Sequence, residues 1–408
     1  MKITDVKIRF VEGVMPPEER SLDMRLRNAV HYLPTNNHYD ITPTNATRGG
    51  AAAAGGSKQI GAFLYIETDE GITGVAGSIM YPDIVGAIIK GGYRGFLIGE
   101  DPLNIERIWD VLYRRDLYNH AGYNILALST VDIALWDIRC KKAGMPLWQM
   151  AGGATQRTLP AYANCVGGAY KEDGSGFDLD EVARLTQWCV DNGFTGSKWY
   201  PHRGPADGQK GIDEIYEMFK IIREVAGPDF KLLLDVWSSW DVYYTLRVAE
   251  KLAKLDFYWI EEPIMPKNVD GYATLNRKSP VSISAGENIV TRWSIKEYLD
   301  KDALEIYQPD PVWCGGVSEC LKIMNLITMY SKRIALHAAC VPISTQLAAT
   351  CANNVHPICE YLLYISPGGQ FFYKNQFVPI NGDLHLPDAP GAGLDIDENK
   401  VTRSWFME

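Results

Sequence analysis

The chain has 408 residues, of which 46% are hydrophobic and 22% charged, a composition typical of a folded protein with a large buried core. This length fits a barrel of roughly 250 residues with an accessory domain of roughly 150. The net charge of −10, without any run of lysine and arginine interleaved with aromatics, argues against a nucleic-acid partner. No N-terminal apolar stretch has the length of a signal peptide or membrane span, so we expect a cytoplasmic protein without a membrane partner.

The first part of the chain mixes strands and helices without a regular alternation. Residues 6–11 and 62–68 are predicted strands, and residues 103–115 are a predicted helix with Asp101 as its N-cap. Between the two strands, residues 42–57 are rich in glycine and alanine and show no hydrophobic periodicity. A mobile loop is the simple interpretation of this segment, and a lid over an active site is the alternative.

From about residue 126 the pattern changes to alternating helices and strands, which is typical of a parallel α/β sheet. The predicted strands are residues 195–199, 231–236, 257–261, 281–286, 304–309, 333–336 and 358–362. This uninterrupted series predicts closure into a barrel. A doubly wound open sheet is the alternative, but the glycine-rich turn expected after its first strand is missing. After Ser366 the repeat is lost, and we expect the tail to fold back onto the first domain.

Three successive apolar runs each end in a carboxylate, namely Asp235, Glu261 and Glu287. The spacings are 261 − 235 = 26 and 287 − 261 = 26 residues, one strand-helix unit each, so a barrel would bring all three to its carboxyl-terminal rim. Crowded carboxylates repel each other unless a cation neutralises them, and Mg²⁺ suits this set of oxygen ligands. The alternative is that each acid caps the following helix.

The next two strands end in Asp310 and His337. A carboxylate bonded to one ring nitrogen fixes the histidine tautomer and raises the basicity of the other nitrogen, which is the arrangement of a general base. A histidine satisfied within the core is the alternative.

Two further charged residues are expected at the same rim. Lys198 ends the strand before Asp235 and would hold a substrate carboxylate against the metal. Glu360 lies on the last strand, and if burial raises its pKa it would donate a hydrogen bond to the same carboxylate. A buried structural salt bridge is the alternative for Glu360. Glu262 is expected to face the other way on its strand and to be structural.

Taken together, these residues lie in motifs that resemble one known family. The motifs are Ser129-Thr130-Val131-Asp132-Ile133-Ala134-Leu135-Trp136-Asp137, Leu234-Asp235-Val236-Trp237, Trp259-Ile260-Glu261-Glu262-Pro263, Gly286-Glu287, Gln308-Pro309-Asp310, Trp313-Cys314-Gly315-Gly316, His337 and Glu360. The chain resembles the enolase superfamily, specifically its mandelate-racemase-like acid-sugar dehydratases, and among these the rhamnonate-dehydratase-like members.

The resemblance implies a fold and a division into domains. It implies a modified (β/α)₇β TIM-like barrel over residues 126–366 and an α+β capping domain over residues 1–125, completed by the tail at residues 367–408. It also implies that Asp235, Glu261 and Glu287 bind Mg²⁺. His337, paired with Asp310, would be the base, and Glu360 would assist the enolate.

One departure from the family pattern carries information. Many relatives have a second lysine two residues after the first, whereas here Tyr200 follows Lys198 at that spacing. Tyrosine is a poor base without strong activation, so an enzyme with a single base is the simpler reading. Tyr200 or His202 would have to act for chemistry on the second face of the substrate.

The expected activity is dehydration of a sugar acid to a 2-keto-3-deoxy acid, in a homo-oligomer like those of most relatives. The alternatives are an epimerase, racemase or cycloisomerase of the same superfamily, or a metal-independent glycoside hydrolase using two of the carboxylates. A sugar-acid binding protein without catalysis is disfavoured by the base and its partner. Which sugar acid fits is left open, and the polar candidates for setting specificity are Arg20, Arg25, His31, His38 and Arg48.

Overall fold

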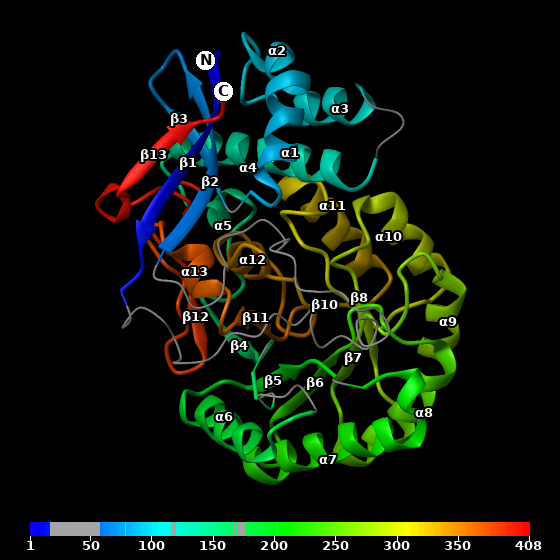
Figure 1. The fold of residues 1–408 in the computed structure, drawn as a ribbon. Helices are drawn as coiled ribbons and strands as arrows, with labels where there is room; N and C mark the ends of the chain where they lie inside the picture. The colour runs from blue at the N-terminus through cyan, green and yellow to red at the C-terminus, as the bar shows by residue number, and fades with distance from the viewer. Residues whose placement is uncertain are drawn as a thin grey trace.

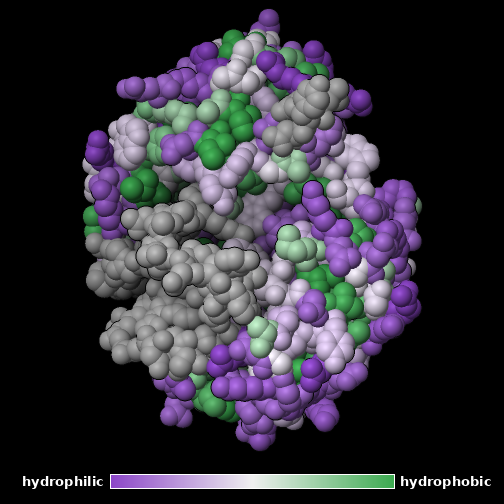
Figure 2. Space-filling view, turned by 45° about the vertical axis from the view of Figure 1, so that its right-hand side comes forward, coloured by the Kyte–Doolittle hydropathy of each residue, from purple (hydrophilic) through white to green (hydrophobic). Residues whose placement is uncertain are grey.

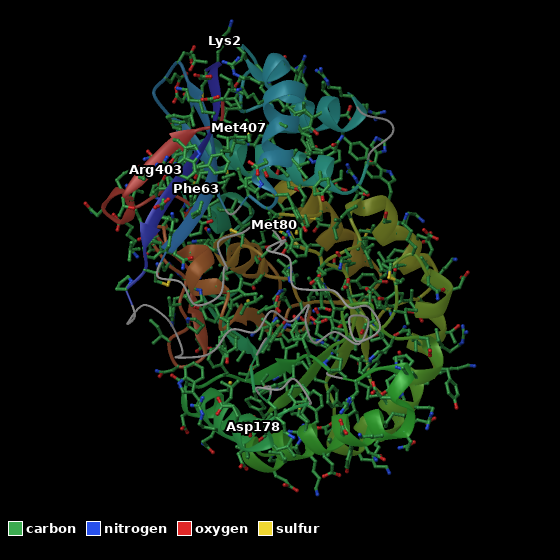
Figure 3. All side chains as sticks on the ribbon, in the orientation of Figure 1. Lys2, Phe63, Met80, Asp178, Arg403 and Met407 are labelled. Carbon is green, nitrogen blue, oxygen red and sulfur yellow. The ribbon has the colours of Figure 1, made fainter. Side chains whose placement is uncertain are left out.

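The cap is built on an antiparallel sheet that joins the two ends of the chain. The computed structural model describes residues 1–16, 58–77, 79–115, 120–166, 168–169, 171, 176–201 and 203–408. The sheet has the order β13-β1-β2-β3. Its strands are β1 (Ile3–Val14), β2 (Lys58–Thr68), β3 (Thr73–Ala76) and β13 (Arg403–Phe406). Figure 3 shows Arg403 and Met407 of the C-terminal segment in the same part of the molecule as Lys2, just before β1, and Phe63 of β2. The predicted return of the tail to the cap is therefore present.

Helices of the cap lie beside this sheet (Figure 1). They are α1 (Pro82–Ala87), η4 (Ile88–Tyr93), α2 (Arg94–Leu97), α3 (Ile105–Arg115) and α4 (Tyr123–Ala143). The apolar residues at helical spacing in α3 are buried, as their periodicity requires. The helix begins at Ile105 and not next to Asp101, so the predicted N-cap is wrong. The Asp101 carboxylate instead accepts a hydrogen bond from the Leu103 backbone within the preceding turn.

Helix α4 connects the cap with the barrel. It packs against β3 on one side and α11 on another, and most of its residues are buried. Two buried carboxylates of α4 bond to the elements around it. Asp137 accepts backbone hydrogen bonds from Val75 and Ala392, and Asp132 accepts one from Ser318. Buried carboxylates must find donors, and these are supplied by backbone amides of the neighbouring elements.

The larger sheet is parallel along its main path and curls into the predicted barrel (Figure 1). In the described part of the chain its order is β10-β9-β8-β7-β6-β5-β4-β11, and β12 pairs with β4 off this path. The strands are β4 (Thr158–Asn164), β5 (Gly196–Trp199), β6 (Lys231–Asp235), β7 (Trp259–Glu261), β8 (Ile283–Ala285), β9 (Ile306–Tyr307), β10 (Arg333–Ile334), β11 (Cys359–Leu362) and β12 (Asp383–His385). Seven of these, β5 to β11, were predicted within a few residues. Strands β4 and β12 were not predicted as such.

Helices surround the curled sheet and supply the rest of its core. They are α5 (Leu147–Met150), α6 (Leu179–Asp191), η5 (Pro205–Asp207), α7 (Gly208–Ala226), α8 (Val242–Leu252), η6 (Ala253–Leu255), α9 (Val269–Lys278), α10 (Thr291–Asp300), α11 (Gly316–Met329), α12 (Val341–Ala348) and α13 (Ser366–Gln370). The short η7 (Glu398–Lys400) lies instead next to β1 of the cap, where Glu398 pairs with Arg9. Figure 3 places Asp178, which caps α6, at the end of the molecule opposite the cap.

The cysteines, the surface and the helices can each be compared with the expectations from composition. All eight cysteines are free and buried. Figure 2 shows hydrophobic residues on the viewed face in several separate groups among hydrophilic ones. In the part of the chain that is described, no helix combines the length and apolarity needed to cross a membrane. The glycine- and alanine-rich residues 42–57 lie outside the described residues.

Candidate active site

The barrel interior has an apolar layer with a polar layer above it. The apolar layer consists of Tyr162, Leu233, Trp259, Ile306, Ala335 and Ile358. Side chains on a strand alternate between its two faces, so the residue two positions further along points to the same interior. Those residues are Asn164, Asp235, Glu261, Gln308, His337 and Glu360, all of them buried. Because the strands are parallel, the polar layer lies at their carboxyl-terminal ends, where barrel enzymes build their active sites.

Lys198 lies at the centre of this polar layer. Its Nζ is 2.8 Å from Glu261 Oε1, 2.8 Å from Glu360 Oε1 and 3.1 Å from Asp235 Oδ2. The side chain is fully buried. Burial alone would lower the pKa of this ammonium, but Glu261, Glu360 and Asp235 raise it well above its usual value. Lys198 is therefore a fixed positive charge shared by carboxylates from three strands.

The three proposed metal ligands lie at this rim but contact different cations. Asp235 and Glu261 contact Lys198, whereas Glu287 Oε2 is 3.0 Å from His337 Nε2. Among the described residues, no three acidic, histidine or cysteine side chains are gathered closely enough to form a preformed metal cage. Opposite charges in a buried site attract one another strongly, so each carboxylate turns to the nearest protein cation.

The donor set nevertheless suits a hard divalent cation. Every candidate ligand is a carboxylate, the ligand type that Mg²⁺ prefers. Burial and the neighbouring Asp235 charge raise the pKa of Glu261 to about 8, even with Lys198 present. Burial and repulsion from Asp235 therefore both disfavour the charged form of Glu261. A bound divalent cation would offset both effects.

The approach of β8 to β9 places Glu287. Gly286 has φ +153°, and an added Cβ would lie 2.4 Å from the backbone nitrogen of Gln308. Only glycine allows the two backbone segments to come so close. The backbone turns at Gly286 and thereby places Glu287 at the rim.

His337 and Asp310 form a buried pair. His337 Nδ1 is 2.6 Å from Asp310 Oδ2, and the Val312 and Ala339 backbone amides hold the two Asp310 oxygens. The ring of Trp313 packs on the imidazole, with ring centroids 4.6 Å apart. Burial disfavours the charged imidazole, but Glu287, Glu360 and Asp310 raise the pKa of His337 to about 10.

Glu360 differs from the sequence expectation. Burial alone would raise its pKa, but Lys198, His337 and the Asn164 amide lower the pKa of this carboxyl to about 2. Its donors are Lys198 Nζ and Asn164 Nδ2, both 2.8 Å from Oε1, and the Ala338 amide, 3.0 Å from Oε2. Glu360 is therefore ionised and accepts hydrogen bonds, so the expectation of a raised pKa and a donated bond is wrong for this arrangement.

Glu262 was expected to face the other way on its strand and to be structural. It is buried, and its Oε2 accepts a hydrogen bond of 2.8 Å from Asn288 Nδ2, which also lies 3.1 Å from Glu287 Oε1. The backbone at Glu262 has φ +40°, and Trp237 and Ser238 on the neighbouring loop are also left-handed. Burial, followed by the charge of Glu262, raises the pKa of Tyr272 on α9 and of Tyr298 on α10, which agrees with a side chain turned toward the surrounding helices.

Tyr200 lies beside the charged cluster. Its hydroxyl accepts a hydrogen bond of 3.3 Å from Asn164 Nδ2. Burial, followed by the nearby charge of Asp235, raises its pKa well above the usual value, in line with a poor base. His202 and the five polar candidates for substrate specificity lie outside the described residues.

Sequence reasoning missed Asn164 and Asn288. Asn164 was overlooked because β4 was overlooked: around Tyr162 the strand has only the small Ala161 and Ala163, which form no strong apolar run, and Pro160 precedes them. An eight-stranded barrel needs one more strand before the first predicted one, and that count was the available signal. Asn288 had no comparable signal in the sequence.

Fold and site together define a barrel protein that has a capping domain, with carboxylate, imidazole and ammonium side chains at the carboxyl-terminal rim. The family model for the enolase C-terminal domain-like family matches residues 180–400, and that for the mandelate racemase / muconate lactonizing enzyme N-terminal domain matches residues 43–152. The chain therefore belongs to the mandelate racemase / muconate lactonizing enzyme group of the enolase superfamily.

Curated relatives cover most of the chain. It is 31% identical over 414 residues to D-galactarolactone cycloisomerase of Agrobacterium fabrum, covering 98% of both chains. It is 30% identical over 341 residues to L-rhamnonate dehydratase of Saccharopolyspora erythraea, covering 81% of this chain and 82% of the relative. A racemase from Streptomyces coelicolor, solved with bound magnesium, has the same fold with a TM-score of 0.77 at 23% identity, covering 98% of each chain.

Proposed function

We propose that this chain is a Mg²⁺-dependent acid-sugar dehydratase. It removes the C2 proton of an aldonate-like sugar acid and eliminates the 3-hydroxyl, which gives water and a 2-keto-3-deoxy acid. The observation that carries the proposal is the buried His337–Asp310 pair, 2.6 Å apart, at the same rim as the carboxylates. The similarity to an L-rhamnonate dehydratase over 81% of the chain supports it.

Asp235, Glu261 and Glu287 would hold the Mg²⁺. When bound, the ion supplies a Lewis acid that polarises the substrate carboxylate and makes the neighbouring C2 proton more acidic. All three carboxylates are buried, so they require a cation partner. Lys198, already in contact with two of them, would place its ammonium near the substrate carboxylate as well.

His337 does the proton chemistry. Asp310 holds its Nδ1, and Nε2, which lies 3.0 Å from Glu287, would take the C2 proton once Glu287 binds the cation and its charge no longer keeps Nε2 protonated. Once protonated, the same nitrogen donates that proton to the departing 3-hydroxyl on the same face, so the proton balance closes within one residue. Asp310 stabilises the imidazolium between the two steps. Ionised Glu360 holds Lys198 on one side and the Ala338 amide, next to the base, on the other.

A cycloisomerase of the same superfamily is the second candidate. The relative that is 31% identical over 98% of both chains is named D-galactarolactone cycloisomerase, and this favours it. Such a reaction isomerises its substrate without loss of water. A racemase or epimerase would require a second group such as Tyr200, whose raised pKa weakens it as a base.

The test is a screen of aldonic acids, aldaric acids and their lactones with Mg²⁺. The dehydratase proposal expects 2-keto acid formation that stops when EDTA is added. Lactone rearrangement without a 2-keto acid would favour the cycloisomerase, and recovered substrate with inverted configuration and solvent deuterium would favour an epimerase. Activity that persists in excess chelator would point to a metal-independent hydrolase.

The His337→Asn variant tests the base. We expect turnover to fall by about 10³-fold or more, since a positioned general base contributes roughly 10² to 10⁴. Calorimetry should show Mg²⁺ binding retained, because His337 is not among the proposed ligands. Undiminished dehydration by this variant would remove His337 from the mechanism. Assembly into a homo-oligomer stays a prediction, which light scattering on the purified protein tests.

A further inference from the structure

Asn164 lies in the polar layer between the strands that carry Lys198 and Glu360, and the proposed reaction does not use it directly. It is the last residue of β4 and pairs with Lys198 on β5, while β11, which carries Glu360, lies on the other side of β4. Its side chain is fully buried. An amide in such a place must have its hydrogen-bonding groups satisfied, and its partners therefore show what it does.

The orientation of the Asn164 amide is fixed by both of its ends. Its Oδ1 accepts a hydrogen bond of 3.0 Å from the Val166 backbone amide. Its Nδ2 lies 2.8 Å from the ionised Glu360 Oε1 and 3.3 Å from Tyr200 Oη. A flipped amide would turn its oxygen to the Glu360 carboxylate and its nitrogen to a backbone donor, so both contacts would become repulsive.

The two amide hydrogens therefore have separate acceptors. One holds the oxygen of Glu360 that also contacts Lys198. The other is donated to the phenol oxygen of Tyr200, so the Tyr200 hydroxyl hydrogen is directed away from Asn164. A single side chain thus sets the position of Glu360 and the direction of the Tyr200 hydroxyl.

We propose that Asn164 is a positioning residue of the active site, which holds Glu360 in place and orients the Tyr200 hydroxyl as a hydrogen-bond donor to the bound sugar acid. This inference rests on the proposed function for the identity of the ligand. It gives Tyr200 the role of a donor and not of a second base. The described contacts of the Asn164 side chain include none of the three proposed metal ligands, so its effect should be separate from metal binding.

Two substitutions separate positioning from a merely structural role. Asn164→Asp keeps an oxygen for the Val166 amide but loses the donors to Glu360 and Tyr200. Asn164→Ala loses all three contacts. Asn164→Asp also brings a second carboxylate next to Glu360, so a wild-type kcat in this variant would count strongly against positioning, and the uncharged Asn164→Ala with the Tyr200 cycle tests the role without added charge. Asn192→Ala is a matched control, since Asn192 is an exposed asparagine that ends α6 and donates to the Trp188 carbonyl.

The experiment measures kcat, KM and Mg²⁺ affinity for each variant on the sugar acid that the screen identifies. We expect Asn164→Asp and Asn164→Ala to lower kcat by about 10²-fold, the loss that misplaced groups commonly cause. Mg²⁺ affinity by calorimetry should stay within about twofold of wild type, and Asn192→Ala should leave all parameters unchanged. Tyr200→Phe in the wild type and in Asn164→Ala completes a double-mutant cycle, whose losses should be less than multiplicative.

Three results would overturn the inference: wild-type kcat in folded Asn164→Asp, an equal loss of Mg²⁺ affinity, or fully multiplicative effects of the Asn164 and Tyr200 substitutions. Crystal structures of the wild type and Asn164→Asp provide a second test that does not depend on enzyme activity. The inference expects the Glu360 carboxylate and the Tyr200 ring to move in the variant, and unchanged positions would refute it. Absence of any wild-type turnover on sugar acids would instead refute the proposed function alone.

Discussion

Acid should destabilise this protein through a buried histidine beneath the active site. The His356 side chain is 1% exposed, and its Nε2 accepts a hydrogen bond of 3.0 Å from the Leu336 backbone amide. Leu336 immediately precedes the proposed base, so this bond holds the end of β10. Burial lowers the pKa of His356 from 6.5 to about 4. Protonation would also replace the acceptor with a donor facing the Leu336 amide.

The linkage between protonation and folding gives the sign and size of the change in unfolding free energy with pH. The folded state favours neutral His356, so its contribution to stability is complete above pH 6.5 and is lost as the pH falls from 6.5 towards 4. The full difference corresponds to about 3 kcal/mol, of which about 2 kcal/mol is lost by pH 5. His356→Gln keeps an acceptor for the Leu336 amide without a group that titrates in this range.

The assay is urea unfolding of wild type and His356→Gln at pH 7.5, 6 and 5. Protonation of carboxylates affects both proteins, so the informative quantity is the difference between their unfolding free energies. We expect that difference to shift by about 2 kcal/mol in favour of the variant between pH 7.5 and pH 5. His385→Gln, on the exposed part of β12, removes an imidazole without breaking this buried bond and should shift nothing. A difference that stays constant with pH would refute the reasoning.

The remaining predictions concern the metal site and the contact between cap and barrel. Glu287→Gln should weaken Mg²⁺ binding by about 10-fold or more in calorimetry, because a neutral amide replaces a charged ligand; unchanged affinity would remove Glu287 from the ligand set. Gly316→Ala should destabilise the fold by about 2 kcal/mol or more, since Gly316 has φ +90° and the new Cβ would lie 2.3 Å from Asp132 Oδ2. Thermal unfolding checks this, and an unchanged Tm would show that α4 and α11 separate easily.

The sequence by itself determined much of the architecture and the membership of the site. Apolar runs that end in Asp235, Glu261 and Glu287 at equal spacing specify one rim of a barrel, since parallel strands place equivalent positions at the same end. The same reasoning placed His337 and Asp310 side by side, and their 2.6 Å contact agrees with it. Periodicity and spacing are local properties, so they can be read without coordinates.

Only the tertiary structure decided how these side chains pair and what charge they carry. Glu360 was expected to be a donor, yet Lys198 and Asn164, from strands distant in the sequence, keep it ionised. Asn288, which no sequence pattern indicated, donates hydrogen bonds to both Glu262 and Glu287. Proton affinity depends on every charge within a few ångströms, and such neighbours are set by the closed barrel and not by the order of residues along the chain.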